Sequence, residues 1–150
     1  MMRTERLSVA LHVLLHMAER PDRPMTSEEM AACVRTNPVV IRRTFAGLRE
    51  AGIVTSVKGH GGGWRLARSA SEVSIAEIQR ALGERIVSLT STMEPPHCRL
   101  LQEVVRSLNE AMREAEQVLD RRLSTLTLAD LASAVPNSGG SPHAGSSHPL

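Results

Sequence analysis

Apolar residues recur at helical spacing near the start of the chain and, over a longer stretch, in its second half. The first pattern predicts a helix over residues 5–19, which Pro21 and Pro24 bring to an end. The residues that recur at helical spacing are Leu7, Leu11, Leu14 and Ala18.

Two short helices are predicted next. Thr26 and Glu29 have the spacing of a capping box, which predicts a helix over residues 27–34. Asn37 can cap a second helix, and Pro38 follows at the position where a missing N–H does no harm. This second helix has an apolar stripe of Ile41, Phe45 and Leu48. Two helices joined by so tight a turn, the second with exposed arginines, are typical of a helix-turn-helix unit.

A β-hairpin is predicted directly after these helices. Residues 53–57 are rich in β-branched side chains, residues 58–63 contain four glycines, and residues 64–67 form a plausible returning strand. A β-hairpin that directly follows a helix-turn-helix is called a wing. A further helix is predicted over residues 74–82, with Ser74 and Glu77 as a second capping box. The expected fold is mainly α with a small β-hairpin wing.

The apolar pattern of the second half runs from residue 98 to about residue 126 and predicts one long helix. A small domain cannot cover so long a stripe, so a second copy of the chain is the expected partner. The residues expected at this homodimer contact are Leu101, Val105, Leu108, Met112, Ala115 and Leu119. The predicted division is a winged helix-turn-helix domain (1–84), a connector (85–97), a dimerisation helix with an end motif (98–132) and a disordered tail (133–150).

Charge is distributed unevenly along the chain, although the net charge is only +2. Residues 1–70 contain eleven Lys and Arg against six Asp and Glu, whereas residues 71–150 contain seven against ten. All but one of the cations are arginines, whose planar guanidinium suits phosphates and guanine edges. The basic first half is therefore expected to face a polyanion, and double-stranded DNA fits the predicted fold.

The predicted DNA interface combines the second helix of the pair with the wing. Base edges are expected to be read by the N-terminal end of that helix, and phosphates to be held by flanking cations, among them Arg68. The full set of predicted DNA-binding residues is Thr26, Ser27, Asn37, Val39, Val40, Arg42, Arg43, Arg49, Lys58, His60, Gly61, Gly62, Gly63, Trp64 and Arg65.

The order of these elements resembles the Rrf2 family of bacterial transcription regulators. The resemblance spans about residues 3–132 and is carried by four runs: ALHVLLHMA (10–18), LREAGIV (48–54), SVKGHGGGWRLA (56–67) and TLADL (127–131). It implies a homodimeric winged-helix repressor or activator acting at a palindromic operator, and we expect repression. Lys58 and Trp64 stand where the family often has arginine and tyrosine.

One departure concerns cofactors. The resemblance implies three cysteines between the fourth helix and the dimerisation helix in the iron–sulfur members, and here this region holds only Cys98. One thiolate cannot hold such a cluster, so no cofactor is expected and the chain is similar to the cluster-free, YwnA-like branch. Cys98 remains a candidate redox sensor at a helix N-terminus, against the alternative of a structural cysteine. Cys33 is expected in the core.

Other chemistry is not expected. His12 and His16 share one helix face and could form a metal pair, but no Glu follows in the zincin pattern and a helix face near the dimer contact is the simpler account, so no metal site is predicted. The run His60–Trp64 resembles an esterase oxyanion motif, but the chain has no Gly-x-Ser-x-Gly, so no catalytic residue is expected. The remaining alternative is a winged helix that binds a protein partner. The expected location is cytoplasmic, without membrane contact, and the expected signal is an unknown small molecule or redox change.

Overall fold

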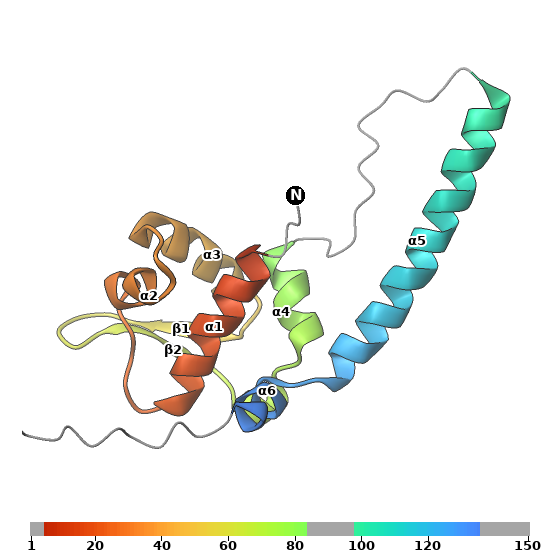
Figure 1. Cartoon of the computed structure of the whole chain (residues 1–150). Coiled ribbons are helices and arrows are strands. Elements are labelled where there is room, and N and C mark those ends of the chain that lie inside the picture. Colours follow the sequence, from red (N-terminus) through yellow and green to blue (C-terminus); the bar gives the residue numbers. More distant parts are fainter. Residues whose placement is uncertain (1–4, 84–97, 136–150) are drawn as a thin grey trace, which may run out of the picture.

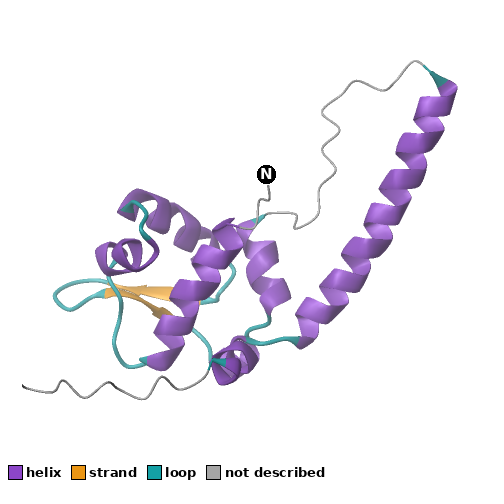
Figure 2. Cartoon of the chain, viewed as in Figure 1, coloured by secondary structure: helices purple, strands orange, loops and turns teal. Residues whose placement is uncertain are grey.

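The computed structural model describes residues 5–83 and 98–135. Helices and strands follow in the order α1 (Glu5–Glu19), α2 (Ser27–Val34), α3 (Pro38–Glu50), β1 (Val54–Val57), β2 (Gly63–Leu66), a 3₁₀ turn (Ala70–Glu72), α4 (Ile75–Leu82), α5 (Arg99–Thr125) and α6 (Leu128–Ala134). Helices dominate and the two strands form one hairpin, so the predicted fold class is confirmed (Figure 2). The predicted connector and most of the predicted tail lie outside the described residues.

Local capping explains where the helices begin. At α2 the Thr26 hydroxyl accepts the Glu29 N–H at 3.1 Å, and the Glu29 carboxylate accepts the Thr26 N–H at 2.9 Å. The same reciprocal pair forms between Ser74 and Glu77 at the start of α4. At α3 the side chain of Asn37 accepts the Val39 N–H at 2.8 Å. The sequence predicts these three helix starts from their capping residues.

The hairpin contains a third, shorter partner. In β1 and β2 the antiparallel register pairs Val54 with Leu66 and Val57 with Gly63. Met25 then forms a β-bridge with Trp64, with N···O distances of 2.9 and 2.7 Å. The wing is therefore hydrogen-bonded to the residue that precedes α2, which fixes its direction relative to the two short helices.

The core lies where α1 packs across α2, α3, α4 and the hairpin (Figure 1). It is almost entirely aliphatic, and Phe45 and Trp64 are its only aromatic residues, with ring centroids 5.8 Å apart. Its fully buried large side chains include Leu14, Met30, Ile41, Leu48, Ile53 and Ile78.

Helix α6 closes this core from the other end of the chain. Leu128, in the predicted end motif, is fully buried, and α6 packs on α1. Two backbone hydrogen bonds attach the segment, from the Ile75 N–H to Leu126 and from the Leu128 N–H to Val73, at 2.9 and 3.0 Å. The end motif therefore packs with the first domain, and the sequence does not predict this contact.

Helix α5 extends away from the rest of the molecule (Figure 1). Its 27 residues make it about 40 Å long. It touches α4, where Arg80 forms an ion pair with Asp120 at 3.3 Å. None of its residues is buried. Among the described residues, no helix combines the length and the apolar character that a membrane crossing requires.

Candidate nucleic-acid interface

The first turn of α3 presents apolar and polar side chains to solvent. Val39 and Val40 are 51% and 46% exposed, although both are β-branched and apolar. They precede the exposed Arg42 and Arg43. Asn37 is also exposed, and because its carbonyl oxygen caps α3, its NH₂ group is the end that remains to donate. An uncovered helix N-terminus of this kind can enter a DNA major groove.

The arginines of α3 differ in what they contact. Arg42 lies 3.9 Å from Glu28 of α2, a loose and solvent-exposed ion pair. The guanidinium of Arg49 lies over the Trp64 ring at 5.7 Å, a cation–π arrangement. Arg43 has no hydrogen-bond or ion-pair partner within residues 5–83 and 98–135. Arg43 is therefore the arginine of α3 whose donors are most available to an incoming ligand.

The tip of the wing is polar and uncovered. Lys58, His60 and Gly61 are exposed, and the wing projects at the end of the molecule where α2 and α3 meet (Figure 1). The glycines that follow the tip allow backbone segments to approach one another closely. A Cβ at Gly62 would lie 2.2 Å from the Val57 carbonyl oxygen, and one at Gly63, whose φ is +149°, would lie 2.4 Å from that of Met25. These two positions therefore require glycine because backbone segments meet there.

Trp64 and Ser27 occupy a different place from the one predicted. Both are only 8% exposed, and the Trp64 Nε1–H donates to the Ser27 hydroxyl at 3.1 Å. Their expected place at the DNA surface is corrected, because the ring is packed against Phe45 and the hydroxyl is already bonded. Thr26 beside them is half-buried and caps α2. These residues hold the wing against the helix pair.

Arg65 and Arg68 also make contacts within the chain. Arg65 donates to the carbonyl of Pro21 at 3.0 Å and remains half-exposed. Arg68 donates to Glu77 at 3.0 Å and to the carbonyls of Gly52 and Glu72. The prediction that Arg68 holds a phosphate is therefore wrong for this arrangement, because its donors join the hairpin to α4. The Ser74 backbone N–H, followed by Arg68, keeps the pKa of Glu77 below its usual value.

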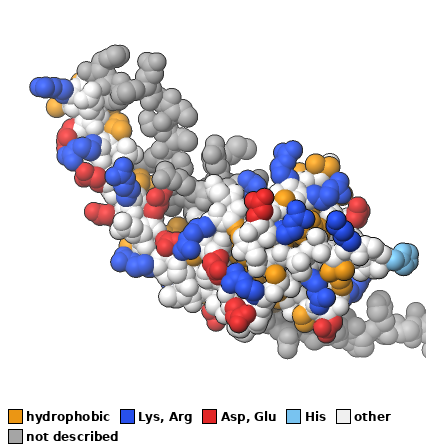
Figure 3. Space-filling view, turned by 180° about the vertical axis from the view of Figure 1, so that it is seen from behind, with side chains coloured by type: hydrophobic (Ala, Val, Ile, Leu, Met, Phe, Trp, Pro, Cys, Tyr) orange, Lys and Arg blue, Asp and Glu red, His pale blue; other side chains and the backbone are white. Residues whose placement is uncertain are grey.

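The remaining cations gather on one part of the surface. Figure 3 shows several Lys and Arg side chains together over the globular part of the molecule, whereas α5 carries Lys or Arg and Asp or Glu in alternation. On α5, Arg106 is paired with Glu103 and with Glu110, the latter at 2.7 Å. The uneven charge along the sequence thus corresponds to a basic globular part and to a helix α5 that carries charges of both signs.

Helix α5 carries a broad apolar face in the open. The predicted dimer residues Leu101 and Leu108 are about half exposed, and Val105, Met112 and Leu119 are partly covered. Three further apolar residues of α5, which are not among the predicted dimer residues, are exposed: Leu100, Val104 and Val118. Val104, Ala111 and Val118 repeat every seven residues beside Leu101, Leu108 and Ala115. This second row completes a heptad pattern.

Cys98 is the N-cap of α5 and is exposed. The backbone N–H groups of Leu101 and Leu100 lower the pKa of its thiol. A helix N-terminus favours the thiolate in this way, which makes the sulfur more reactive. Cys33, which was expected in the core, is exposed on α2. That expectation is wrong, because the side chain lies at the surface and points toward α1, with its Sγ 3.4 Å from His12 Nε2.

Comparison with known proteins identifies relatives over nearly the whole chain. The model of the Rrf2 family, described as iron-dependent transcriptional regulator, matches residues 3–134. YwnA of Bacillus subtilis is 30% identical over 127 residues, which is 84% of this chain and 93% of that protein. Protein rrf2 of Nitratidesulfovibrio vulgaris is 30% identical over 140 residues, or 89% of each chain. The crystal structure of Staphylococcus aureus CymR superposes with a TM-score of 0.62 at 27% identity, covering 87% of this chain and 97% of that one.

The description of the family raises the question of iron. Iron–sulfur clusters are held mainly by cysteine thiolates, and this chain has only Cys33 and Cys98. Figure 1 shows the start of α5, which Cys98 caps, well apart from α2, which carries Cys33. One protomer therefore brings no two thiolates together, and its residues do not fit an iron–sulfur cluster.

Proposed function

The chain belongs to the Rrf2 family of DNA-binding transcriptional regulators, and we propose that it acts as a homodimer that binds a palindromic operator and represses transcription. The observation that carries this proposal is the uncovered first turn of α3 on the same globular body as the exposed wing tip, with exposed cations on both elements. Neither surface is covered by the described parts of the chain.

Base reading is assigned to the N-terminal end of α3. Arg43 can donate two parallel hydrogen bonds to a guanine, and the NH₂ group of Asn37 can donate to an acceptor on a base edge. Val39 and Val40 offer methyl groups to thymine. Since Arg43 alone of these has long reach and unengaged donors, it is expected to carry most of the discrimination between sequences.

Phosphate contacts are assigned to the cations around α3 and on the wing. Lys58 and His60 lie at the wing tip, and Arg42 is held only by a long ion pair that a phosphate can replace. The exposed Gly61 lets the wing backbone approach a sugar-phosphate wall closely. Arg49 and Arg65 are engaged within the chain, so we assign them the role of orienting the wing.

Dimerisation is assigned to α5. Leu100 is 79% exposed and Val118 is 59% exposed, and such a stripe on a helix of about 40 Å leaves a large apolar area in water. A second α5 packed by a twofold axis covers the same stripe on both copies. Two α3 helices related by that axis would read two half-sites in successive major grooves, which is the reason to expect a palindrome.

The direct test is binding to the DNA upstream of its own gene, followed by fluorescence anisotropy at several salt concentrations. We expect a sequence-dependent complex whose affinity falls steeply with salt, because phosphate contacts release counterions. Equal binding to scrambled DNA, or no complex, would overturn the proposal. A salt-insensitive complex with a protein instead would support the alternative of a protein-binding winged helix.

Two further measurements test the oligomeric state of the protein and the direction of its effect on transcription. Sedimentation velocity of the full chain is expected to give a dimer at micromolar concentration, and a monomer at all concentrations would contradict the twofold arrangement. A reporter under the upstream region is expected to be more active when the gene is deleted. Lower activity after deletion would indicate an activator.

A further inference from the structure

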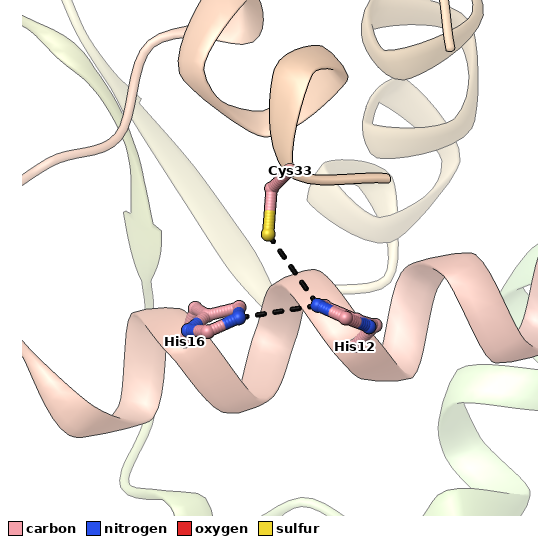
Figure 4. A group of neighbouring side chains, drawn as sticks. All are labelled: His12, His16 and Cys33. Atoms are coloured by element: carbon pink, nitrogen blue, oxygen red, sulfur yellow. Dashed lines mark hydrogen bonds between the residues drawn. The ribbon is translucent and has the colours of Figure 1, made fainter. Parts of the chain in front are cut away.

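Three potential metal ligands from two helices meet on the surface of the DNA-binding body. His12 and His16 project from α1, and Cys33 projects from α2 toward them (Figure 4). The ligand atoms of all three lie within 4.8 Å of one another, and all three residues are exposed. The predicted interface with DNA uses none of them.

The two distances from His12 are close to those between the ligands of a tetrahedral zinc ion. His12 Nε2 lies 3.1 Å from His16 Nε2 and 3.4 Å from Cys33 Sγ. Zinc binds nitrogen at about 2.0–2.1 Å and thiolate sulfur at about 2.3 Å, so its tetrahedral ligands are about 3.3–3.6 Å apart. The two distances from His12 need to change by only a few tenths of an ångström, whereas the third pair, His16 and Cys33, lies within 4.8 Å and would have to close by up to about 1.3 Å.

Hydrogen bonding alone satisfies this cluster poorly. The Nε2 atom of a neutral histidine is either one donor or one acceptor, and His12 Nε2 faces two neighbours at contact distance. Only one of the two contacts can then be a full hydrogen bond. A cation between the three atoms accepts all three lone pairs at once, because it replaces the competing protons.

A carboxylate beside His16 also favours metal binding by these three residues. His16 Nδ1 lies 3.4 Å from the Glu19 carboxylate, one turn along α1. A carboxylate on Nδ1 favours the tautomer that leaves Nε2 with a lone pair, and histidines that bind metals are commonly oriented in this way. This observation is independent of the distances between the three ligand atoms.

A fourth ligand has room to bind. A cavity of about 240 Å³ adjoins the cluster and is lined by His16, Arg20, Arg23, Met25, Glu29 and Cys33. The charge of Arg23 is balanced by Glu29 at 2.6 Å. Water can therefore reach an ion held by the three residues, which gives a site with one open position.

We propose that His12, His16 and Cys33 form a zinc site that joins α1 to α2. Imidazole and thiolate ligands select zinc, which also ranks above ferrous iron in affinity for such donors. The sequence alone predicts no metal here because it shows only the pair on α1, and Cys33 lies on another helix. Since α2 precedes the reading helix, the ion fastens the helix pair to α1.

The first test is titration of the reduced, metal-free full chain with Zn²⁺ against a chromogenic chelator. We expect one ion per protomer and a rise in the melting temperature on binding. Cys33→Ser is expected to weaken binding by more than the roughly 10–100-fold that loss of an outer-shell partner costs, whereas Glu19→Gln is expected to fall within that range. Failure of the wild-type chain to bind Zn²⁺ would overturn the proposal.

Co²⁺ serves as a spectroscopic probe that reports the ligands directly. A sulfur-to-cobalt charge-transfer band is expected in the wild-type chain and in Cys98→Ser, and is expected to vanish in Cys33→Ser and weaken in His16→Gln. The variant His143→Ala/His148→Ala should bind like wild type. A band that survives Cys33→Ser, or that is lost in Cys98→Ser, would place the metal elsewhere. Melting curves of the metal-free variants serve to check that each is folded.

Discussion

The Trp64 indole N–H donates a hydrogen bond to the Ser27 hydroxyl over 3.1 Å, in a place where both residues are almost fully buried. This bond joins the second strand of the wing to the first turn of α2. It fixes the wing against the helix pair from inside the molecule, so the angle between the two elements that are proposed to face DNA depends on a buried contact.

Removing this bond should cost stability. Trp64→Phe leaves the Ser27 hydroxyl without its donor, and an unsatisfied buried polar group costs about 1–3 kcal/mol in the free energy of unfolding. Urea unfolding of Trp64→Phe, Ser27→Ala and the double variant gives the coupling between the two. Strictly additive effects would show that the two groups do not interact.

Gly63 should tolerate alanine far less than Gly61 does. Both have positive φ, but a Cβ at Gly61 meets open space, whereas at Gly63 it would lie 2.4 Å from the Met25 oxygen. We expect Gly61→Ala to cost about 1 kcal/mol and Gly63→Ala about 3 kcal/mol or more, measured by urea unfolding. Equal losses would mean that the bridge between Met25 and Trp64 contributes little.

Substitutions at Arg43 and Lys58 should distinguish recognition of bases from binding of phosphates. Arg43→Ala is expected to lower operator affinity by about 1–3 kcal/mol and to relax base preference, whereas Lys58→Ala should weaken all DNA alike and reduce the salt slope by about 1. The matched control is Arg113→Ala, an exposed arginine on α5. If Arg113→Ala lowered affinity as much as Arg43→Ala, net charge alone would explain the loss.

A charge on the apolar face of α5 should abolish the dimer. Leu108 is half exposed in the single chain, and in the proposed dimer an Asp at this position is buried without a partner on both copies. An uncompensated buried charge costs about 3–5 kcal/mol. Sedimentation velocity should show monomeric Leu108→Asp with weakened operator binding, and an unchanged dimer for Glu114→Ala on the polar side. A dimeric Leu108→Asp would place the contact on another face.

The Cys98 thiol should react faster in the folded chain than in the unfolded one. Because the helix amides lower its folded pKa, more thiolate is present at any pH below the unfolded pKa, and the difference vanishes well above it. Alkylation rates of the Cys33→Ser variant with and without urea, followed against pH, measure this shift. Coincident profiles would contradict it. For redox sensing, operator binding should respond to oxidant in wild type and not in Cys98→Ser.

Short-range signals in the sequence predict most of the fold. The capping residues Thr26, Asn37 and Ser74 mark the starts of three helices because each bonds a backbone N–H two or three residues away. The hairpin is predicted within one residue at either end. By contrast, the burial of Leu128 depends on contacts with α1, more than a hundred residues earlier in the chain, and no local pattern encodes such a contact.

The predicted interface was less accurate than the predicted elements. Sequence indicates which side chains have a chemistry that suits DNA, but the chemistry of Trp64, Ser27 and Arg68 is the same whether they face a ligand or a neighbouring segment. Only the packing distinguishes the two cases. The meeting of Cys33 with His12 is of the same kind, because the crossing of α1 and α2 decides which side chains on the two helices come together.

The attachment of α6 to α1 also bears on the synthesis of the protein. The body that presents α3 is closed by Leu128, which leaves the ribosome only after α5 has been made. A nascent chain that ends at α4 still exposes the hydrophobic surface that this residue will cover. The hydrophobic core of that body is therefore completed only late in translation, after α5 has been made.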